Sequence, residues 1–378
     1  MSARGLPVRG TLGIQFLETR VDSEVARYYL ASYLSGQRGD QQLDARIDRA
    51  YRDYSSALPN RDELKRLSEE FSIDFAALYF AERISNGPMS RRFRQDFENA
   101  RDYVRRSLSA GGVKLSDTAK GFEIFFVPGY LYRRHPATGA DFAAPRATLK
   151  QVGFAHYFLD TDEDGPIEAN AELVLAALRA RSRAGRRVIV VSASKSGPEV
   201  ALALTKLGAL EARQITAWIN IVGTLQGTPL ADEKLWQDME DLIGQVDIAG
   251  VESMTTEQSR RRFGRFRIPK DVFVVNYIGI PLVGSVSSLA RPGFQRLRKH
   301  GPNDGLSLLS DLIYPRGLTL VDLGRDHFLL DDELDITTLA LTTTIVRWLE
   351  SNQTNASWAD TGESRSGAAQ LPLTPLPE

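Results

Sequence analysis

The chain has 378 residues, of which 42% are apolar and 25% are charged, a composition typical of folded globular proteins. Its 47 basic and 48 acidic residues nearly cancel, which argues against a protein that binds nucleic acid through a broad basic surface. The sequence contains no cysteine, so disulfides, a thiol nucleophile, iron–sulfur clusters and cysteine-bearing zinc sites are excluded. Four histidines, at positions 135, 156, 300 and 327, are the candidates for any reaction that needs an imidazole.

The N-terminus gives no indication of export. Its first ten residues carry positive charge but lack the apolar run of a signal peptide, and no stretch of the chain reaches the ~18 apolar residues of a membrane-spanning helix. We therefore expect a soluble, cytoplasmic protein. At roughly 100–200 residues per domain, the length suits two domains, or one large domain with an appendage.

Residues 1–120 are predicted to form a helical N-terminal region. Between positions 22 and 110, apolar residues recur at three- and four-residue spacing, as four or five helices would require. Asn60, followed three residues later by Glu63, predicts a helix start, and the run 85–88 (Ser-Asn-Gly-Pro) predicts the end of another helix. Tyr and Phe at helical spacing are typical of a packed core, so we assign no chemistry to this region.

Residues 121–350 show a different pattern, in which short apolar runs alternate with amphipathic helical segments. This alternation predicts an α/β domain with a doubly wound, mostly parallel sheet that has helices on both faces. The expected strands are 122–127, 153–159, 187–191, 216–222, 272–278 and 318–323, and the clearest helices are 167–183 and 198–207.

An insertion at about 233–270 interrupts the alternation, and such an insertion often caps the edge of the sheet where ligands bind. It ends in a basic cluster of Arg260, Arg261, Arg262, Arg265, Arg267 and Lys270. Two interpretations stay open: a solvated helix face, or a patch that contacts an anionic substrate or membrane surface. Residues 351–378 turn polar and then proline-rich, which predicts a disordered tail.

The segment 188–198 (VIVVSASKSGP) carries the most informative motif, a buried strand that runs through small residues into a helix. In the nucleophile elbow G-x-S-x-G, the central serine sits in a strained turn between strand and helix, and crowding requires small flanking residues. Here Ser194 takes the central position, with Ser192 and Ser196 in place of the glycines. A serine-rich turn that only caps a helix is the alternative.

Two other motifs fit these residues less well. The spacing of Ser192 and Lys195 matches the S-x-x-K pattern of Ser–Lys acyl enzymes, but that pattern needs both residues on one helical turn and Ser192 is predicted to end a strand. A phosphate-binding P-loop needs glycine at the positions held by Ile189 and Ser194.

A serine nucleophile needs a base, and His327 is the best candidate because it follows the last predicted strand, in the loop 324–328. His135 lies in a loop after the first strand and could touch substrate. His156 lies inside an apolar strand and His300 at a predicted helix end, so both fit a structural role better.

The acid that orients the base is predicted to be Asp304, in the turn 301–306 that follows the 272–278 strand. Asp311 fits a following helix, Asp322 lies within the last strand and Asp326 is adjacent to the histidine, so these three are weaker candidates. The chain order Ser194, Asp304, His327 is the order that the α/β-hydrolase fold requires.

An oxyanion hole in such a site uses the N–H after the nucleophile and a second N–H from the loop after an early strand. Lys195 supplies the first N–H. The turn 128–130 (Pro-Gly-Tyr) stands where the second is needed, and Tyr130 is the predicted donor, although an ordinary strand-ending turn would show the same residues.

Together these residues resemble the α/β-hydrolase superfamily, in particular its lipase, esterase and thioesterase branches. In those families a His-Gly-x turn, a G-x-S-x-G-G elbow, an Asp-Gly-x-Val turn and an Asp-His pair occur in this order. The resemblance covers residues 121–350. Pro128 stands where many relatives carry histidine, and Ser192 and Ser196 replace the elbow glycines.

The predicted function is that of a serine hydrolase that cleaves a carboxylic ester or thioester through an acyl-enzyme. We expect a small acyl ester or lipid-like substrate, no nucleic-acid partner, no metal and no organic cofactor. Two alternatives stay open: a non-catalytic binding or regulatory protein on the same scaffold, and an acyltransferase with the same triad. The residues leave the acyl chain, the leaving group and the oligomeric state open.

Overall fold

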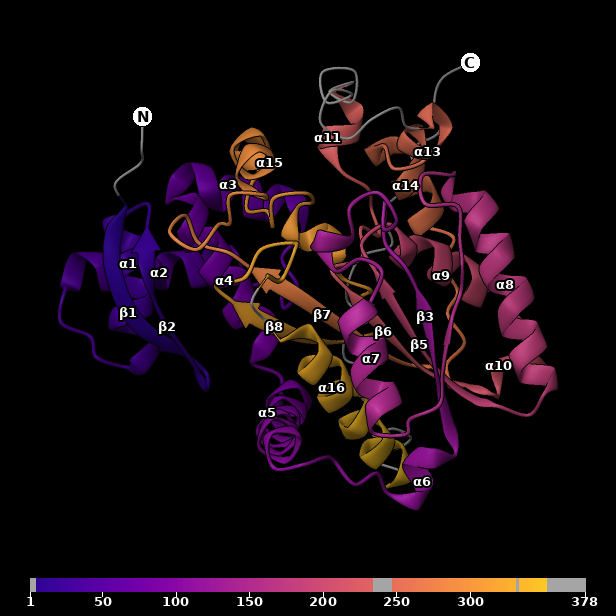
Figure 1. Cartoon of the computed structure of the whole chain (residues 1–378). Helices are drawn as coiled ribbons and strands as arrows, with labels where there is room; N and C mark the ends of the chain where they lie inside the picture. Colours follow the sequence, from indigo (N-terminus) through magenta and orange to yellow (C-terminus); the bar gives the residue numbers. More distant parts are fainter. Residues whose placement is uncertain (1–4, 234–246, 331–332, 352–378) are drawn as a thin grey trace, which may run out of the picture.

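A parallel β-sheet forms the centre of the protein, whose computed structural model describes residues 5–233, 247–330 and 333–351 (Figure 1). Six strands pair in the order β4-β3-β5-β6-β7-β8, and every neighbouring pair is parallel. Helices cover both faces of this sheet, so the predicted doubly wound α/β architecture is confirmed.

The strands are β1 (Leu6–Leu12), β2 (Gln15–Val21), β3 (Phe122–Val127), β4 (His156–Phe158), β5 (Arg187–Ala193), β6 (Ile215–Ile221), β7 (Phe273–Ile280) and β8 (Leu318–Leu323). The α-helices are α1 (Glu24–Ala31), α2 (Gln41–Asp53), α3 (Arg61–Glu70), α4 (Ile73–Ser85), α5 (Pro88–Ser109), α6 (Asp117–Lys120), α7 (Ala143–Gln151), α8 (Ile167–Arg183), α9 (Ser196–Thr205), α10 (Ala209–Ala212), α11 (Pro229–Asp232), α13 (Ile248–Glu252), α14 (Thr256–Phe263), α15 (Arg291–Leu297) and α16 (Leu334–Glu350). Short 3₁₀ helices are η1 (Tyr33–Ser35), η2 (Pro136–Thr138), η3 (Arg298–His300) and η4 (Leu309–Leu312).

Local sequence patterns located several of these elements well. Strands β3 and β8 and helix α8 have the predicted bounds. Strand β7 runs two residues beyond its predicted end, because Gly279 and Ile280 continue to pair with β8. Helix α3 begins with the predicted capping box, in which Asn60 accepts from the Glu63 N–H and Glu63 accepts from the Asn60 N–H.

Alternate residues of the strands enter two separate hydrophobic cores, as the two-residue period of a strand requires. On one face, Ile189 and Val191 of β5 pack in a cluster with residues of α5, α7 and α16. On the other face, Val188 and Val190 pack in a cluster with residues of α8 and α9. Burial on both faces explains why these strands read as continuous apolar runs in the sequence.

The N-terminal region is not entirely helical, which corrects the prediction for residues 1–120. Strands β1 and β2 form an antiparallel hairpin, and the helices begin only at Glu24. A two-residue turn closes the hairpin at Gly13 and Ile14, and Gly13 adopts a positive φ of 60° that suits such a turn. Strand pairing and this turn, rather than helical periodicity, organise these residues.

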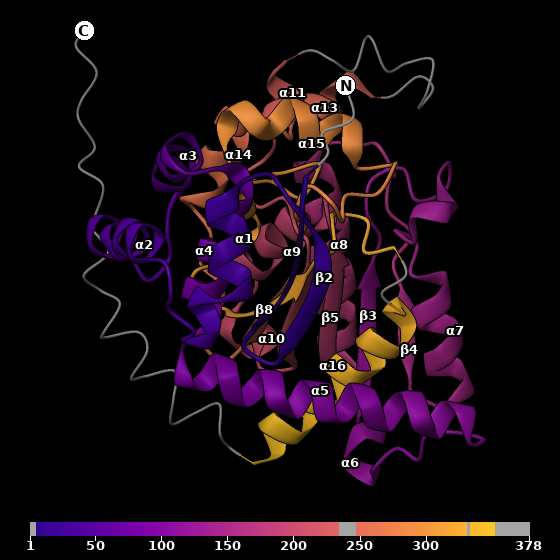
Figure 2. The same ribbon diagram turned by 90° about the vertical axis from the view of Figure 1, so that its left-hand side faces the viewer.

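The N-terminal helices share one hydrophobic cluster with the last two strands of the sheet. Residues of α1, α2, α3 and α4 pack with Ile278 and Ile280 of β7 and with Val321 and Leu323 of β8. Figures 1 and 2 show α4 beside β8, with the other N-terminal helices on the same side of the molecule, at the end of the sheet opposite β4. The helical layer therefore covers a part of the sheet that α8 and α9 do not reach.

Side chains from the N-terminal region also bond to the free edge of the sheet at β8. Gln15 accepts a hydrogen bond from the Leu323 N–H at 3.0 Å, and Arg94 donates to the Val321 carbonyl. These two side-chain bonds occupy backbone groups that an unprotected edge strand would offer to another chain.

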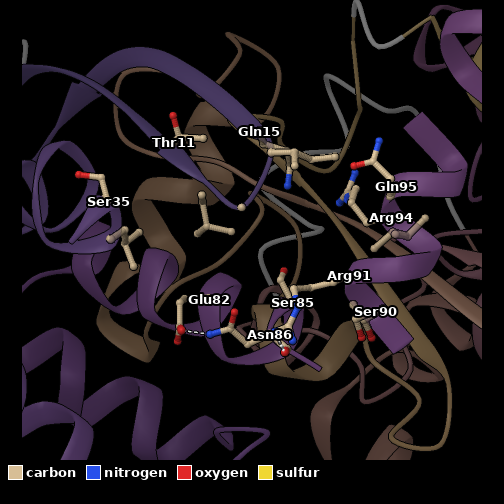
Figure 3. A pocket seen from close by; sticks show the side chains of 16 residues that line it. Thr11, Gln15, Ser35, Glu82, Ser85, Asn86, Ser90, Arg91, Arg94 and Gln95 are labelled. Atoms are coloured by element: carbon tan, nitrogen blue, oxygen red, sulfur yellow. Dashed lines mark hydrogen bonds between the residues drawn. The ribbon is translucent and has the colours of Figure 1, made fainter. Parts of the chain in front are cut away.

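A cavity of about 640 Å³ lies next to these contacts, between the hairpin turn, the α4–α5 junction and β8 (Figure 3).

The predicted insertion and tail are described only in part. Within 233–270, helices α13 and α14 are placed, whereas residues 234–246 lie outside the described residues. The predicted disordered tail lies outside them too, apart from Ser351. None of the helices that the structure describes is both long enough and apolar enough to cross a membrane.

A large-to-small substitution in the shared cluster tests whether the N-terminal helices and the sheet unfold as one unit. Phe80 of α4 is fully buried there, and Phe80→Ala should lower the free energy of unfolding by about 3–5 kcal/mol. Of the tryptophans that the structure describes, Trp218 lies in β6 and Trp348 in α16, where it bonds to Asp96 of α5, so tryptophan fluorescence during urea unfolding reports on the sheet domain and its contact with α5. We expect that transition to move to lower urea.

Tyr103→Ala is the matched control, because this side chain is 43% exposed on α5 and its loss should change stability by less than about 0.5 kcal/mol. An unchanged tryptophan transition in Phe80→Ala, beside a separate early transition in circular dichroism, would show two independent units and contradict the prediction.

Candidate active site

Ser194 occupies a sharp turn between β5 and α9. Its φ of 55° lies in the left-handed region, which is uncommon for a residue with a side chain. Main-chain hydrogen bonds hold this conformation. The Ser194 N–H donates to the Ile221 carbonyl at 3.0 Å, and the Ser194 carbonyl accepts from the N–H groups of Gly197 at 3.0 Å and Thr224 at 3.1 Å. The strand, the tight turn and the helix have the geometry predicted for the elbow, with Ser194 presented beyond the carboxyl end of a central strand.

The two serines that replace the usual elbow glycines are both buried and hydrogen-bonded. Ser192 accepts a hydrogen bond from the Trp218 indole N–H at 2.8 Å. The Ser196 hydroxyl lies 2.8 Å from the Val127 carbonyl and accepts from the Ala193 N–H at 2.8 Å. The hydroxyls thus fill space between β3, β5 and β6 that a glycine would leave empty, so these departures from the family pattern are compatible with the elbow.

Ser194, His327 and Asp304 form one hydrogen-bonded chain. The Ser194 Oγ lies 2.9 Å from His327 Nε2, and His327 Nδ1 lies 2.6 Å from Asp304 Oδ2. His327 and Asp304 are buried, whereas Ser194 is partly exposed. A carboxylate at Nδ1 favours the tautomer with the proton on that nitrogen, which leaves Nε2 to accept the Ser194 proton.

The turn 301–306 holds Asp304 in place from both sides. The Oδ1 atom of Asp304 accepts from the Leu306 N–H at 2.9 Å and from the Ser307 N–H at 2.7 Å. The main-chain carbonyl of Asp304 accepts from the His327 N–H at 2.8 Å. One carboxylate oxygen therefore fixes the turn, and the other oxygen is directed at the imidazole.

The three weaker acid candidates have other partners. Asp311 lies buried in η4 and pairs with the partly exposed Arg61 of α3; burial raises the pKa of Asp311 while Arg61 opposes that rise. Asp322 accepts from the Tyr277 hydroxyl at 2.8 Å. Asp326 accepts from the Ser287 N–H at 2.7 Å and so holds the loop that carries His327. The Arg61–Asp311 pair ties the N-terminal helices to the segment that follows Asp304.

The other histidines lie away from this chain of hydrogen bonds. His156 is in β4, where Nδ1 lies 3.2 Å from the Phe154 carbonyl. His300 is in η3, 3.7 Å from Glu233, and burial lowers its pKa. His135 precedes η2 in the loop that follows β3. The structure therefore brings only His327 to Ser194 among the four histidines, all of which are described.

The turn after β3 lies directly against the elbow. A Cβ atom on Gly129 would come within 3.3 Å of the Ala193 carbonyl and 3.7 Å of the Ser194 Cβ, so only glycine allows this approach without crowding. Tyr130 follows, and Leu131 then adopts a positive φ of 54°. The Tyr130 N–H thus belongs to a constrained turn beside Ser194, and its role as an oxyanion donor stays a prediction.

Lys195 supplies the N–H after Ser194 and caps α9, where the first N–H groups of a helix lack intrahelical acceptors. The Lys195 side chain is 2% exposed and pairs with Glu199 at 2.6 Å. The ammonium group therefore points into the protein beneath the elbow, and only the Lys195 main chain faces the candidate oxyanion site.

Apolar side chains flank the site on two sides. Tyr130 packs against a cluster formed by Ile167, Ala231, Val251 and Met254, which includes residues of the insertion. On the His327 side, Phe328 packs with Ile73, Val286, Ala290 and Phe294. The cavity at β8 contains no residue of the Ser194–His327–Asp304 chain. Among the described residues, no group of three potential acidic or histidine ligands is placed to hold a metal ion.

One residue of the basic cluster at the end of the insertion is buried. Arg262 is buried and donates to Glu168 at 2.8 Å and to the Ser253 carbonyl at 3.0 Å. Arg261 pairs with Glu257 one turn earlier on α14. Arg262 therefore serves packing, and only its neighbours remain exposed as candidates for an anionic contact.

Sequence reasoning missed the buried polar residues that surround the elbow, namely Glu163, Asn170 and Glu199. The four-residue spacing of Lys195 and Glu199 on a helix could have indicated their ion pair. No local pattern indicates Asn170 or Glu163, because their partners lie on distant segments.

No family model and no curated protein matches the sequence. Among solved structures, the metagenomic carboxyl esterase MGS0156 is 20% identical with a TM-score of 0.51, over 64% of this chain and 78% of that chain. The mature lipase BlEst2 of Bacillus licheniformis is 24% identical with a TM-score of 0.49, over 60% of this chain and 95% of that chain. The hyperthermophilic esterase of Pyrobaculum calidifontis is 11% identical with a TM-score of 0.33, over 67% of this chain and 93% of that chain. The parallel sheet, its helical layers and the likeness to the first of these structures show that this chain has the α/β-hydrolase fold.

Proposed function

We propose that the protein is a serine hydrolase that cleaves carboxylic esters or thioesters. The observation that supports this most directly is the hydrogen-bonded chain from Ser194 through His327 to Asp304, with distances of 2.9 and 2.6 Å. The site lies at the carboxyl ends of the parallel strands, where enzymes of this fold act. The solved structure with a TM-score of 0.51 is named as a carboxyl esterase, which agrees with this chemistry.

Acylation begins when Ser194 Oγ attacks the carbonyl carbon of the substrate and His327 Nε2 takes the hydroxyl proton. Asp304 stabilises the imidazolium that forms and keeps its ring oriented. The N–H groups of Tyr130 and Lys195 donate to the oxyanion of the tetrahedral intermediate. The intermediate collapses when the C–O or C–S bond to the leaving group breaks, and His327 returns the proton to that group.

Deacylation repeats the same steps with water as the nucleophile. His327 removes a proton from water, the hydroxide attacks the acyl-enzyme, and the oxyanion again sits between Tyr130 and Lys195. Collapse of the second intermediate releases the carboxylic acid and returns the proton to Ser194.

The two apolar clusters beside the site favour an uncharged acyl group. Tyr130 with Val251 and Met254 offers apolar surface on one side, and Phe328 with Val286 offers it on the other. A small acyl ester or lipid-like substrate therefore suits the site better than a charged one.

The same geometry bears on the alternative of a non-catalytic binding protein. A scaffold without turnover has no need for a serine held at positive φ within 2.9 Å of a buried histidine. Retention of the strained serine together with both of its partners favours catalysis.

Ser194→Ala should abolish covalent labelling by a fluorophosphonate probe and lower kcat for p-nitrophenyl acetate or butyrate by at least roughly 10⁴-fold, because the nucleophile is lost. The measurement is in-gel probe labelling together with steady-state kinetics across a panel of acyl esters and thioesters of increasing chain length. Ser109→Ala is the control, since this serine is exposed on α5 and bonds only to the carbonyl one turn earlier. Persistent labelling of Ser194→Ala would refute the assignment.

Asp304→Asn should lower kcat by about 10⁴-fold while the protein stays folded. The amide oxygen can still accept from Leu306 and Ser307, but the group that faces His327 becomes an NH₂ donor and enforces the wrong tautomer. Asp322→Asn, at the carboxylate that bonds to Tyr277, is the control and should keep wild-type kcat. Equal kcat in the two variants would mean that Asp304 is not the acid of the triad.

A further inference from the structure

The two proposed oxyanion donors belong to different segments of the chain. Tyr130 lies in the turn after β3, whereas Lys195 lies at the start of α9, after β5. An oxyanion hole works only when both N–H groups converge on one point, and a misplacement of about 1 Å can cost about 100-fold in rate. The structure must therefore contain something that holds these two segments at a constant separation.

Glu163 holds the first segment. Its carbonyl accepts from the Leu131 N–H at 3.1 Å, and its Oε2 accepts from the N–H groups of Arg133 at 2.9 Å and Arg134 at 3.1 Å. Its Oε1 also accepts from the Arg134 side chain at 2.8 Å. Three main-chain donors just after Tyr130 thus converge on one residue, which stabilises the positive φ of Leu131.

Glu199 holds the second segment. It lies in the first turn of α9, and its Oε1 accepts from the Lys195 ammonium at 2.6 Å. Both side chains are about as buried as any in the protein, with 2% and 1% exposure. Burial raises the pKa of Glu199, and the neighbouring Lys195 opposes that rise. Because Lys195 carries the second N–H donor, its anchored side chain limits how far that donor can move.

Asn170 connects the two anchors. This side chain, 1% exposed in the first turn of α8, donates from Nδ2 to Glu199 Oε1 at 2.9 Å and to the Asp162 carbonyl at 2.8 Å. Its Oδ1 accepts from the Asp162 N–H at 3.1 Å. Asp162 directly precedes Glu163, so one amide group bonds both to the loop that holds the Tyr130 turn and to the carboxylate that holds Lys195.

We propose that Asn170 is a positioning residue that fixes the separation between the Tyr130 and Lys195 N–H groups. The proposal rests on the proposed function, since it assigns those two N–H groups to the oxyanion. Asn170 hydrogen-bonds to neither Ser194, His327 nor Asp304 and acts only through Asp162 and Glu199. Buried networks of this kind hold geometry well when their members are satisfied, and one removed member loosens them.

Asn170→Leu tests the proposal, because leucine has a similar size and removes all three hydrogen bonds. We expect kcat for p-nitrophenyl butyrate to fall about 10–100-fold with KM within about 3-fold of wild type, since the lost interaction acts in the transition state. Asn170→Ala, which also removes the three hydrogen bonds and adds neither bulk nor charge beside Glu199, is the second variant in case the first fails to fold. In this variant too, kcat should fall while KM stays close to that of the wild type.

Two controls separate positioning from a general loss of stability. Glu172→Gln lies on the same helix at an exposed position paired with Lys206, and it should keep wild-type kcat and KM. Leu178→Ala lowers stability in the buried face of the same helix, two turns beyond Asn170, so folded Leu178→Ala at low temperature should also keep wild-type kcat. A kcat loss in Leu178→Ala equal to that in Asn170→Leu would overturn the proposal.

Amide resonances give a readout that does not depend on turnover. In spectra of protein labelled with ¹⁵N-tyrosine and ¹⁵N-lysine, Asn170→Leu should shift the Tyr130 and Lys195 amides, and Glu172→Gln should leave both unchanged. Unshifted amides, an unchanged kcat, or a loss confined to KM would each overturn the positioning role. Wild-type protein that neither labels with fluorophosphonate nor hydrolyses esters, yet shows the amide shifts, would instead refute the proposed function while the structural coupling stands.

Discussion

The short contacts from Ser194 to His327 and from His327 to Asp304 join three segments that the chain brings together from far apart. Ser194 and His327 are 133 positions apart in sequence, yet their side chains meet at 2.9 Å. Such a contact needs three independent loops to arrive at the same end of the sheet with little freedom. Much of the surrounding structure can be understood as the means of restricting those loops.

Each loop is restricted by a different device. The elbow is closed by main-chain hydrogen bonds around Ser194, at the cost of a left-handed φ. The acid turn is closed by Asp304 itself, which accepts from the Leu306 and Ser307 N–H groups. The histidine loop is held by Asp326 through the Ser287 N–H. In all three, a polar side chain or carbonyl satisfies main-chain groups that a buried loop would otherwise leave unpaired.

The N-terminal region takes part in this restriction although it carries none of the three proposed catalytic residues. Its helices supply one side of the core over β7 and β8, the two strands that lead into the loops of Asp304 and His327. Arg61 pairs with Asp311 just beyond the acid turn, and Gln15 and Arg94 bond to the edge of β8. The region thus acts as part of the scaffold of the site, a role that its amphipathic helices alone did not disclose.

Local patterns determined the architecture and the identity of the candidate residues. Apolar runs predicted β3 and β8 because buried parallel strands are apolar on both faces, and the scarcity of histidine led directly to His327. Ser194 and Asp304 followed from turn residues at the ends of strands. The β1–β2 hairpin was not predicted, because its alternation of apolar and polar residues is short and the pairing depends on a turn at Gly13.

Only the tertiary structure decided which side chains meet across the fold. The sequence shows Lys195 four residues before Glu199, but whether that pair is solvated or buried depends on α8 and on Asn170 packing over it. Likewise, Glu163 becomes an anchor for the Tyr130 turn only when two loops separated by about thirty positions lie side by side. Secondary structure follows from interactions between near neighbours, which a sequence displays, whereas these contacts depend on how whole elements pack.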